Sequence, residues 1–151
     1  MKIAAPLSVA MVFIAACAIP VRAAAQNAQT PVATAACPAP DDLQPAHLWG
    51  LWQVRFGDEA GAATVLFEKH PERGESLRGA INRNSVQALL AGDVDDGVLT
   101  LDESDDGRRI SAIWSGNVVA GSCGKEFTGT WRRANDTTER SFVLRKLPGW
   151  Q

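Results

Sequence analysis

The segment VQALLAGDVDDGVLTLDESDDGRRISAIWSGNVV runs from Val86 to Val119 and decides the fold. Within it, apolar and polar side chains alternate in three bursts, over residues 86–94, 98–103 and 109–119. Alternation of period two is typical of a β-strand with one buried face. Asp95-Asp96-Gly97 and Asp105-Asp106-Gly107 separate the bursts, and Asp-Gly suits the positive φ angles of a tight hairpin turn. The segment therefore predicts three antiparallel strands joined by two hairpins.

The same alternation extends over the rest of the chain from Leu43 onward. Five further bursts have this pattern, over residues 48–56, 62–69, 76–83, 125–133 and 141–147. Eight short strands predict a sandwich or a barrel, and the short links between them favour up-and-down order. Closure also removes the unpaired edges that invite aggregation. We therefore expect an all-β domain over residues 43–151, an eight-stranded antiparallel meander barrel, with no convincing helical stripe.

Composition limits the class of protein further. The chain has 151 residues, 46% of them hydrophobic and 21% charged, which is enough for one domain with its own core. The formal net charge is −2, and no basic cluster is longer than Arg132-Arg133. A nucleic-acid partner is therefore not expected.

The first 25 residues have the features of an export signal. Lys2 precedes an apolar run from Ile3 to Ile19, which is shorter and richer in alanine than a membrane span. Ala23-Ala24-Ala25 offers the small side chains of a cleavage site, whereas Ile14-Ala15-Ala16-Cys17 matches a bacterial lipobox that would be lipidated at Cys17. The protein is expected in the periplasm or secreted, or as an outer-membrane lipoprotein, with a membrane contact only through that lipid. A retained membrane anchor is the remaining interpretation.

Residues 26–42 are rich in Ala, Thr, Pro, Gln and Asn and predict a flexible leader before the barrel. Removal or lipidation of Cys17 leaves two thiols, Cys37 and Cys123, which most simply form one disulfide in an oxidising compartment. A metal site is the rival interpretation. Because His47 and His70 lack ligand spacing with each other or with the cysteines, we expect neither a metal nor a cofactor.

Catalytic motifs are not evident. The segment Gly121-Ser122-Cys123-Gly124 does not have the spacing of a nucleophile elbow. Many of the carboxylates lie in the two Asp-Gly turns, where solvated turn residues are the ordinary interpretation. No catalytic residue is assigned, and the protein is not expected to be an enzyme.

Gly50-Leu51-Trp52 on the first expected strand, with Arg145 on the last, resembles the calycin pattern of lipocalins, fatty-acid-binding proteins and avidins. In those families G-x-W stands at the closed end of a barrel, and a late arginine packs over the tryptophan. The resemblance implies structural roles for Gly50, Trp52 and Arg145. The size of the domain is closer to avidins and to the Inh-type inhibitors of secreted metalloproteases.

Four tryptophans are candidates for binding. Trp52, Trp114 and Trp131 are all predicted to face inward, where they could line a ligand pocket or simply fill the core. Trp49 is out of phase with the core face. It is expected either to be exposed on a partner-binding surface or to cap the barrel end under the leader.

Three classes of function are compatible with these features. The first is an exported, non-catalytic binding protein of the bacterial cell envelope that holds a small apolar ligand or an envelope component. The second is an inhibitor of a protease or other hydrolase, similar to the Inh type, whose leader at residues 26–42 enters the active site of its target. The third is a structural envelope lipoprotein without a ligand.

Overall fold

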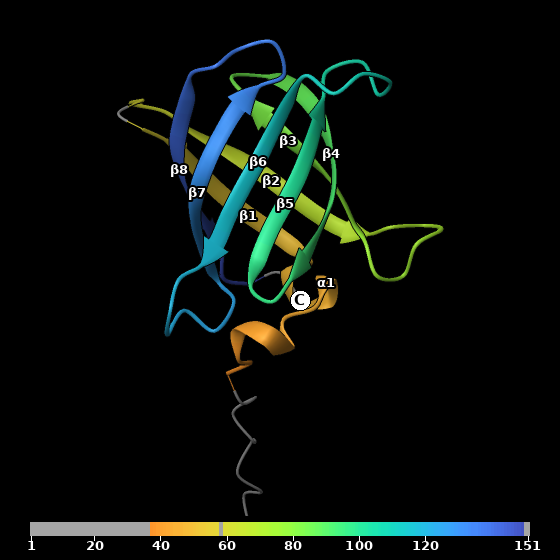
Figure 1. Ribbon diagram of the computed structural model, residues 1–151, viewed down its shortest axis with the longest axis vertical. Helices are drawn as coiled ribbons and strands as arrows, with labels where there is room; N and C mark the ends of the chain where they lie inside the picture. The colour runs from red at the N-terminus through yellow and green to blue at the C-terminus, as the bar shows by residue number, and fades with distance from the viewer. Residues whose placement is uncertain (1–36, 58, 150–151) are drawn as a thin grey trace, which may run out of the picture. The chain divides into compact units, whose positions relative to one another are not determined.

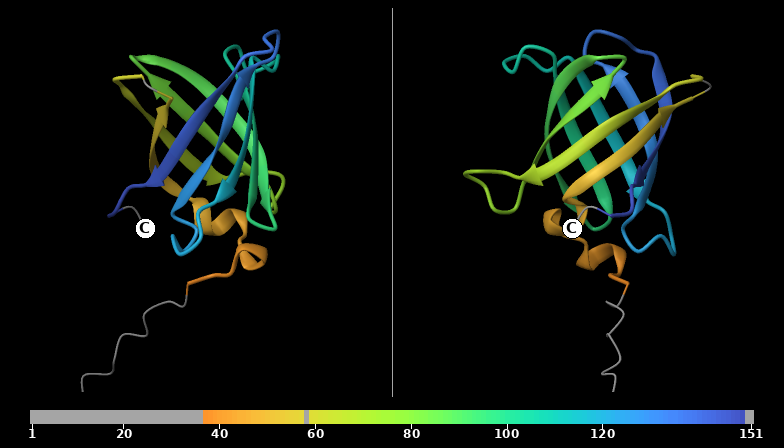
Figure 2. Two further views of the ribbon diagram at one scale, coloured as in Figure 1. Left: turned by 60° about the vertical axis from the view of Figure 1, so that its left-hand side comes forward. Right: turned by 180° about the vertical axis from the view of Figure 1, so that it is seen from behind.

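Eight antiparallel strands form a closed barrel in which each strand pairs with its neighbours in the sequence and β8 returns to β1. The strands are β1 (Gly50–Phe56), β2 (Ala62–Lys69), β3 (Leu77–Arg83), β4 (Val86–Asp95), β5 (Val98–Ser104), β6 (Ala112–Val118), β7 (Glu126–Arg133) and β8 (Glu139–Lys146). Figures 1 and 2 show the strands tilted across the barrel wall. The predicted eight-stranded up-and-down barrel is therefore confirmed.

The computed structural model describes residues 37–57 and 59–149. The expected signal peptide at residues 1–25, the lipidation candidate Cys17 and most of the expected leader lie outside the described residues. Within the described ranges, no helix is long and apolar enough to cross a membrane.

The apolar side chains that alternate along the strands point inward and fill the barrel. On β1, for example, Trp52, Val54 and Phe56 are buried, whereas the residues between them are exposed. The ring centroid of Trp52 lies 6.0 Å from that of Phe67 and 5.9 Å from that of Phe127. Trp114 makes similar contacts further along the barrel, with centroids 5.1 Å from Phe56 and 5.0 Å from Phe142. The inward aromatic side chains thus pack against one another as a core.

Two glycines stand where a side chain would not fit the backbone of this small barrel. Gly50 begins β1 with a φ of 120°, a conformation that side-chain-bearing residues rarely adopt. A Cβ at Gly129 would lie 2.0 Å from the backbone oxygen of Ser115 on β6, so only glycine allows the two strands to approach there.

A short helix, α1 (Pro45–Leu48), covers one end of the barrel, and a 3-10 turn, η1 (Pro40–Asp42), precedes it (Figure 1). Leu48 is fully buried, and its carbonyl oxygen accepts a hydrogen bond of 2.6 Å from Nε1 of Trp52. The sequence pattern did not predict this helix and began the first strand at Leu48 instead of Gly50. Four residues are too few to show a helical stripe, so tertiary contacts decide the conformation here. We call this the leader end, and the opposite end the open end.

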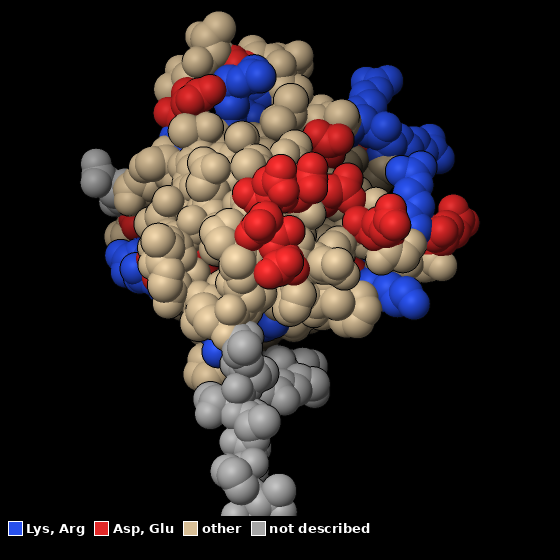
Figure 3. Space-filling view, turned by 60° about the horizontal axis from the view of Figure 1, so that its bottom comes forward, with Lys and Arg blue, Asp and Glu red and all other residues tan. Residues whose placement is uncertain are grey.

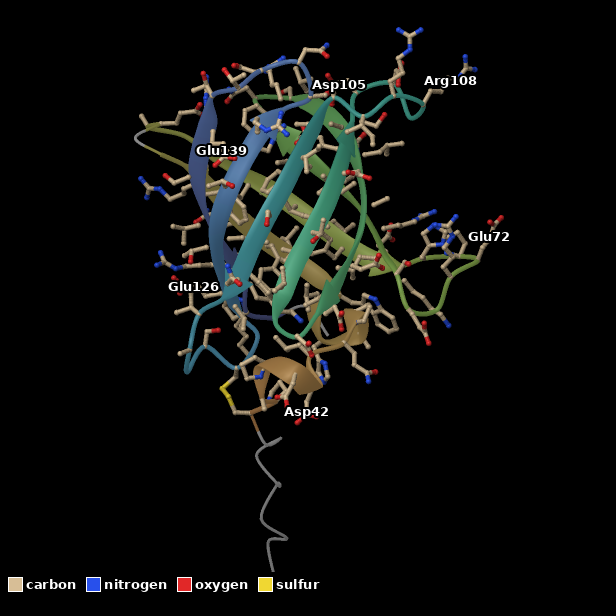
Figure 4. All side chains as sticks on the ribbon, viewed as in Figure 1. Asp42, Glu72, Asp105, Arg108, Glu126 and Glu139 are labelled. Carbon is tan, nitrogen blue, oxygen red and sulfur yellow. A yellow bond between two sulfur atoms is a disulfide. The ribbon has the colours of Figure 1, made fainter. Side chains whose placement is uncertain are left out.

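The disulfide expected between the leader and the barrel is confirmed. The sulfur atoms of Cys37 and Cys123 lie 2.14 Å apart, at bonding distance. The link connects the segment before η1 to the β6–β7 loop, and both lie at the leader end (Figure 4). The described part of the leader is therefore held against the barrel.

One predicted hairpin is confirmed and the other is corrected. Asp96 and Gly97 have φ angles of 47° and 78° between β4 and β5, as a tight Asp-Gly turn requires. The second Asp-Gly pair lies instead in a longer loop over residues 105–111. There one carboxylate oxygen of Asp106 accepts the backbone N–H groups of Arg108 and Arg109, each at 2.8 Å. These side-chain bonds stabilise the longer loop in place of a two-residue turn.

The expectation that Arg145 covers Trp52 is wrong. Arg145 pairs with Gln53 across the β1–β8 ladder, on the outer face, and its Nη2 lies 2.9 Å from Oε1 of Glu126. Lys146 is the residue that lies opposite Trp52, and its Nζ is 5.7 Å from the centroid of the Trp52 ring. Strand alternation explains the correction, because Lys146 shares the phase of the inward residues of β8 and Arg145 does not.

Candidate functional site

The open end of the barrel contains a cavity of about 160 Å³. It lies at the end away from α1, where Asp105 is labelled in Figure 4, whereas Asp42 marks the leader end. Aromatic and charged side chains from β1, the β1–β2 loop, β3, β7 and β8 line it: Phe56, Glu59, Arg83, Trp131, Arg133 and Arg140. The cavity is thus built where strands distant in sequence end together.

A buried carboxylate, that of Glu103, lies behind this cavity and is hydrogen-bonded to two of the residues that line it, Arg83 and Trp131. Glu103 is only 2% exposed because strand alternation on β5 turns it inward with Leu99 and Leu101. Both of its oxygens are bound by the guanidinium of Arg83, and Nη2 of Arg83 lies 2.9 Å from Oε2. The ion pair with Arg83 offsets the free-energy cost of burying the Glu103 carboxylate.

The same carboxylate fixes two of the inward tryptophans. Nε1 of Trp114 donates a hydrogen bond to Oε2 of Glu103 at 2.9 Å, and Nε1 of Trp131 donates to the same oxygen at 3.0 Å. Both indole N–H groups would otherwise be buried without an acceptor. Glu103 therefore sets the orientation of Trp131, which forms one wall of the cavity.

Opposing influences act on the pKa of Glu103. Burial raises this pKa, but the hydrogen bonds and charge of Arg83, together with the two indole hydrogen bonds, lower it by more. The net effect holds the pKa of Glu103 below its ordinary value of 4.5. The carboxylate is therefore ionised at neutral pH and provides the negative charge that Arg83 requires.

Three arginines surround the ring of Trp131. The guanidinium carbons of Arg83, Arg133 and Arg140 lie 5.4, 5.8 and 5.7 Å from its centroid. These distances are within the range of cation–π attraction. Arg140 also pairs with Glu59, but more than half of each side chain in that pair is exposed. Across residues 37–57 and 59–149, Arg133 has no ion-pair partner.

A second hollow of about 500 Å³ adjoins the cavity and is more open to solvent. Phe56, Glu59 and Arg140 line both spaces, and Gly57, Glu139 and Ser141 complete the second. The Arg140–Glu59 pair thus stands at the boundary between the enclosed cavity and the outer hollow.

The structure separates the three tryptophans proposed from the sequence as ligand-binding residues. Only Trp131 lines the open-end cavity. Trp114 is fully buried in the aromatic core, and Trp52 is fully buried near the leader end, where its N–H bonds to Leu48.

Sequence reasoning missed Glu103 and the three arginines of the cavity. A signal was present for two of them, because Glu103 follows Leu99 and Leu101 in phase, and Arg83 follows Leu77 and Ile81 in phase. Opposite charges at inward positions near the same end of a barrel predict a buried ion pair. The positions of Arg133 and Arg140 around Trp131 depend on the pairing of β7 with β8, which places Trp131 opposite Arg140.

Trp49, the residue expected at a partner surface, lies at the leader end and is 37% exposed. It borders a groove of about 780 Å³ that also includes Leu43 and Pro45 from the leader segment. Acidic residues line the same groove: Asp41, Glu75, Asp93 and Asp95. Figure 3, which turns this end toward the viewer, shows acidic side chains gathered on this face.

Comparison with known proteins adds no assignment: no family model matches the chain, and no curated protein does either. Among the described side chains, no group of three or more His, Cys, Asp or Glu is placed to hold a metal ion. The open end thus brings aromatic side chains and guanidinium hydrogen-bond donors together around one cavity.

Proposed function

We propose that the protein is an exported, non-catalytic binding protein of the cell envelope that holds a small ligand at the open end of its barrel. The cavity beside Trp131 is the observation that carries this proposal. An eight-stranded barrel has room for its own side chains or for one small ligand. Here the aromatic core occupies the interior from Trp52 to Trp114, so binding is directed to the open end.

The walls of the cavity fit a ligand with an apolar body. Phe56 and Trp131 present aromatic surface, and their ring centroids lie 5.6 Å apart. Glu103, which is held by Arg83, fixes the indole of Trp131 by a hydrogen bond. The aromatic wall of the cavity is therefore largely formed before a ligand arrives. Such preorganisation reduces the ordering cost of binding.

Binding of benzene-sized probes, measured by isothermal titration calorimetry, tests this proposal. Benzoate, benzamide and benzylamine cover three charge states of one ring. We expect at least one of them to bind the wild type and to bind Trp131→Ala more weakly, while Trp49→Ala at the leader end binds like the wild type. Failure of all three to bind, or equal binding by a folded Trp131→Ala variant, would contradict a ligand site at the open end.

A second candidate function is inhibition of a protease at the leader end. It is favoured by the exposed Trp49 beside a large groove, next to a leader segment that Cys37 ties to the barrel. Exposed tryptophan is enriched at protein interfaces. A panel of secreted metalloproteases tests this candidate: inhibition that weakens in Trp49→Ala would support it, and no inhibition by the full mature chain would exclude it for those enzymes.

Export and membrane attachment remain part of the proposal. The signal features at residues 1–25 support export, and the lipobox at Cys17 supports the alternative of a structural envelope lipoprotein. The intact mass of the exported protein separates these forms. A chain that begins at Gln26 indicates ordinary cleavage, whereas a chain that begins at an acylated Cys17 indicates a lipoprotein.

The calycin assignment is likewise proposed. It is supported by Gly50 and Trp52 near the leader end and by the Lys146 cation on the Trp52 ring. Lys146 provides this cation where the calycin pattern implied Arg145.

A further inference from the structure

We propose that the ligand of the open-end cavity is a small aromatic monoanion, such as a ring that bears one carboxylate, bound by Arg140 and Arg133 against the face of Trp131. This inference rests on the proposed binding function and specifies the chemical class of its ligand. Three features carry it: the balance of charge, the availability of two arginines and the size of the cavity.

The balance of charge around the cavity is positive. Three arginines line it, and the carboxylates of Glu59 and Glu103 form ion pairs with two of them, Arg140 and Arg83. Counted over the residues that line the enclosed cavity, together with Glu103, one positive charge is in excess. Two further acids lie outside this lining: Glu139 in the adjoining hollow, and Asp136, whose carboxylate interacts with the charge of Arg140. Three guanidinium groups around one indole also repel one another, because all three lie within 6 Å of the ring centroid. A single negative charge on the ligand would neutralise this cluster.

The arginines differ in how firmly they are already engaged. Arg83 directs both terminal nitrogens to the buried Glu103 and is held in place by it. Among the described residues, Arg140 forms one ion pair, with Glu59, and the side chains of that pair are 55% and 51% exposed. An exposed pair of this kind contributes little and can exchange partners. A ligand carboxylate can therefore replace Glu59 on Arg140, with Arg133 completing a two-sided anion site.

The cavity has the size of one aromatic ring. Its volume is about 160 Å³, and a cavity of about 150 Å³ is known to hold benzene. Phe56 and Trp131 provide the apolar contact for the ring. Guanidinium groups form planar, paired hydrogen bonds with carboxylates, which suits an acid better than an alcohol or an amide. The adjoining hollow leaves space for a substituent that extends past Arg140 toward solvent.

Titration calorimetry with the mature protein and matched probes tests this inference. We expect benzoate to bind about tenfold or more tightly than benzamide, its neutral counterpart, and benzylamine to bind least. Arg140→Gln and Arg133→Gln should each weaken benzoate binding about fivefold or more and leave benzamide binding unchanged. Because Glu59 competes for Arg140, Glu59→Gln should strengthen benzoate binding. Arg145→Gln, on the outer face, is the matched control and should bind benzoate like the wild type.

The outcomes separate this inference from the proposal on which it rests. If benzamide binds as tightly as benzoate, or if the two arginine variants retain full benzoate affinity, the anion assignment is overturned while the small-ligand site stands. If no probe binds the wild type, the proposed function fails and this inference fails with it. Arg133 and Arg140 are exposed, so both variants should fold, and their thermal unfolding midpoints check this.

Discussion

Arg83 and Glu103 form a doubly hydrogen-bonded ion pair inside the barrel, with Nη2 of Arg83 2.9 Å from Oε2 of Glu103. The same carboxylate oxygen accepts the indole N–H groups of Trp114 and Trp131. A buried network of this kind is stable only when each member is satisfied. Here it joins the aromatic core to the wall of the open-end cavity, so the stability of the barrel and the shape of the site depend on the same group.

Glu103→Gln is expected to destabilise the protein. Glutamine retains the size of the side chain but leaves Arg83 unpaired and weakens the acceptor for two indoles. Because Arg83 is 28% exposed and can be partly hydrated, we expect the free energy of unfolding to fall by about 3 kcal/mol, the lower part of the range for broken buried pairs. Urea unfolding measures this change. Glu68→Gln, which removes a comparable but exposed pair with Arg78, is the control and should change stability little.

The contribution of Glu103 should also depend on pH. Its pKa is lower in the folded protein than its ordinary value of 4.5, so the unfolded chain binds more protons in that region and stability rises with pH. The difference in unfolding free energy between wild type and Glu103→Gln should be complete above about pH 5.5 and should shrink as the pH falls through the lowered pKa. Urea unfolding from pH 7 to pH 3 measures it. A difference that stays constant over this range would show that the charge of Glu103 does not contribute.

Two neighbouring residues at the end of β8, Lys146 and Arg145, should differ in their contribution to stability. Lys146 donates a hydrogen bond of 2.7 Å from Nζ to the carbonyl of His47 and lies over the ring of Trp52. Lys146→Met should therefore reduce the free energy of unfolding by about 1 kcal/mol. Arg145→Met should have little effect, because Glu126 on the outer face is the one partner of Arg145 among the described residues. Thermal unfolding of both variants compares them, and a larger loss from Arg145→Met would contradict the observed register.

The barrel is predictable from the sequence because its signals are local. Alternation over Val86–Val94 and the Asp-Gly turn at Asp96 each specify a strand or a hairpin without reference to the rest of the chain. The helix α1 and the loop at residues 105–111 are not specified in this way. The conformation of α1 depends on contact between Leu48 and the barrel, including the hydrogen bond from Trp52. The conformation of the loop depends on the hydrogen bond that the Asp106 carboxylate accepts from the backbone N–H of Arg108.

The candidate site is less predictable because it is assembled across strands. Trp131 was predicted to face inward, and alternation on β5 and β3 also placed Glu103 and Arg83 inward, although sequence reasoning did not use that signal. Whether these residues meet depends on the stagger of the strands around the closed barrel, which alternation alone does not fix. The error over Arg145 has a simpler origin, because the phase of β8 already favoured Lys146.

Loss of the disulfide should destabilise the chain through its unfolded state. The bond closes a loop with a sequence separation of 86 residues, for which the chain-entropy model gives about 4.6 kcal/mol. Cys37→Ser should lower the unfolding free energy by about 2–5 kcal/mol. The double variant with Cys123→Ser should behave like the single variant, since either change removes the same bond. Urea unfolding of both variants, without reductant, checks this, and a clear difference between them would indicate that Cys123 has a second role.

The central claim is that the inside of the barrel is filled and that a ligand binds at the open end. Nuclear magnetic resonance of the indole N–H groups tests it most directly, because each tryptophan gives one signal that a Trp→Phe variant assigns. On titration with benzoate, we predict that the Trp131 signal moves and that the Trp52 signal, at the other end of the core, stays in place. Movement of the Trp52 signal with no change at Trp131, or no movement of any indole signal with benzoate, benzamide or benzylamine, would contradict the account.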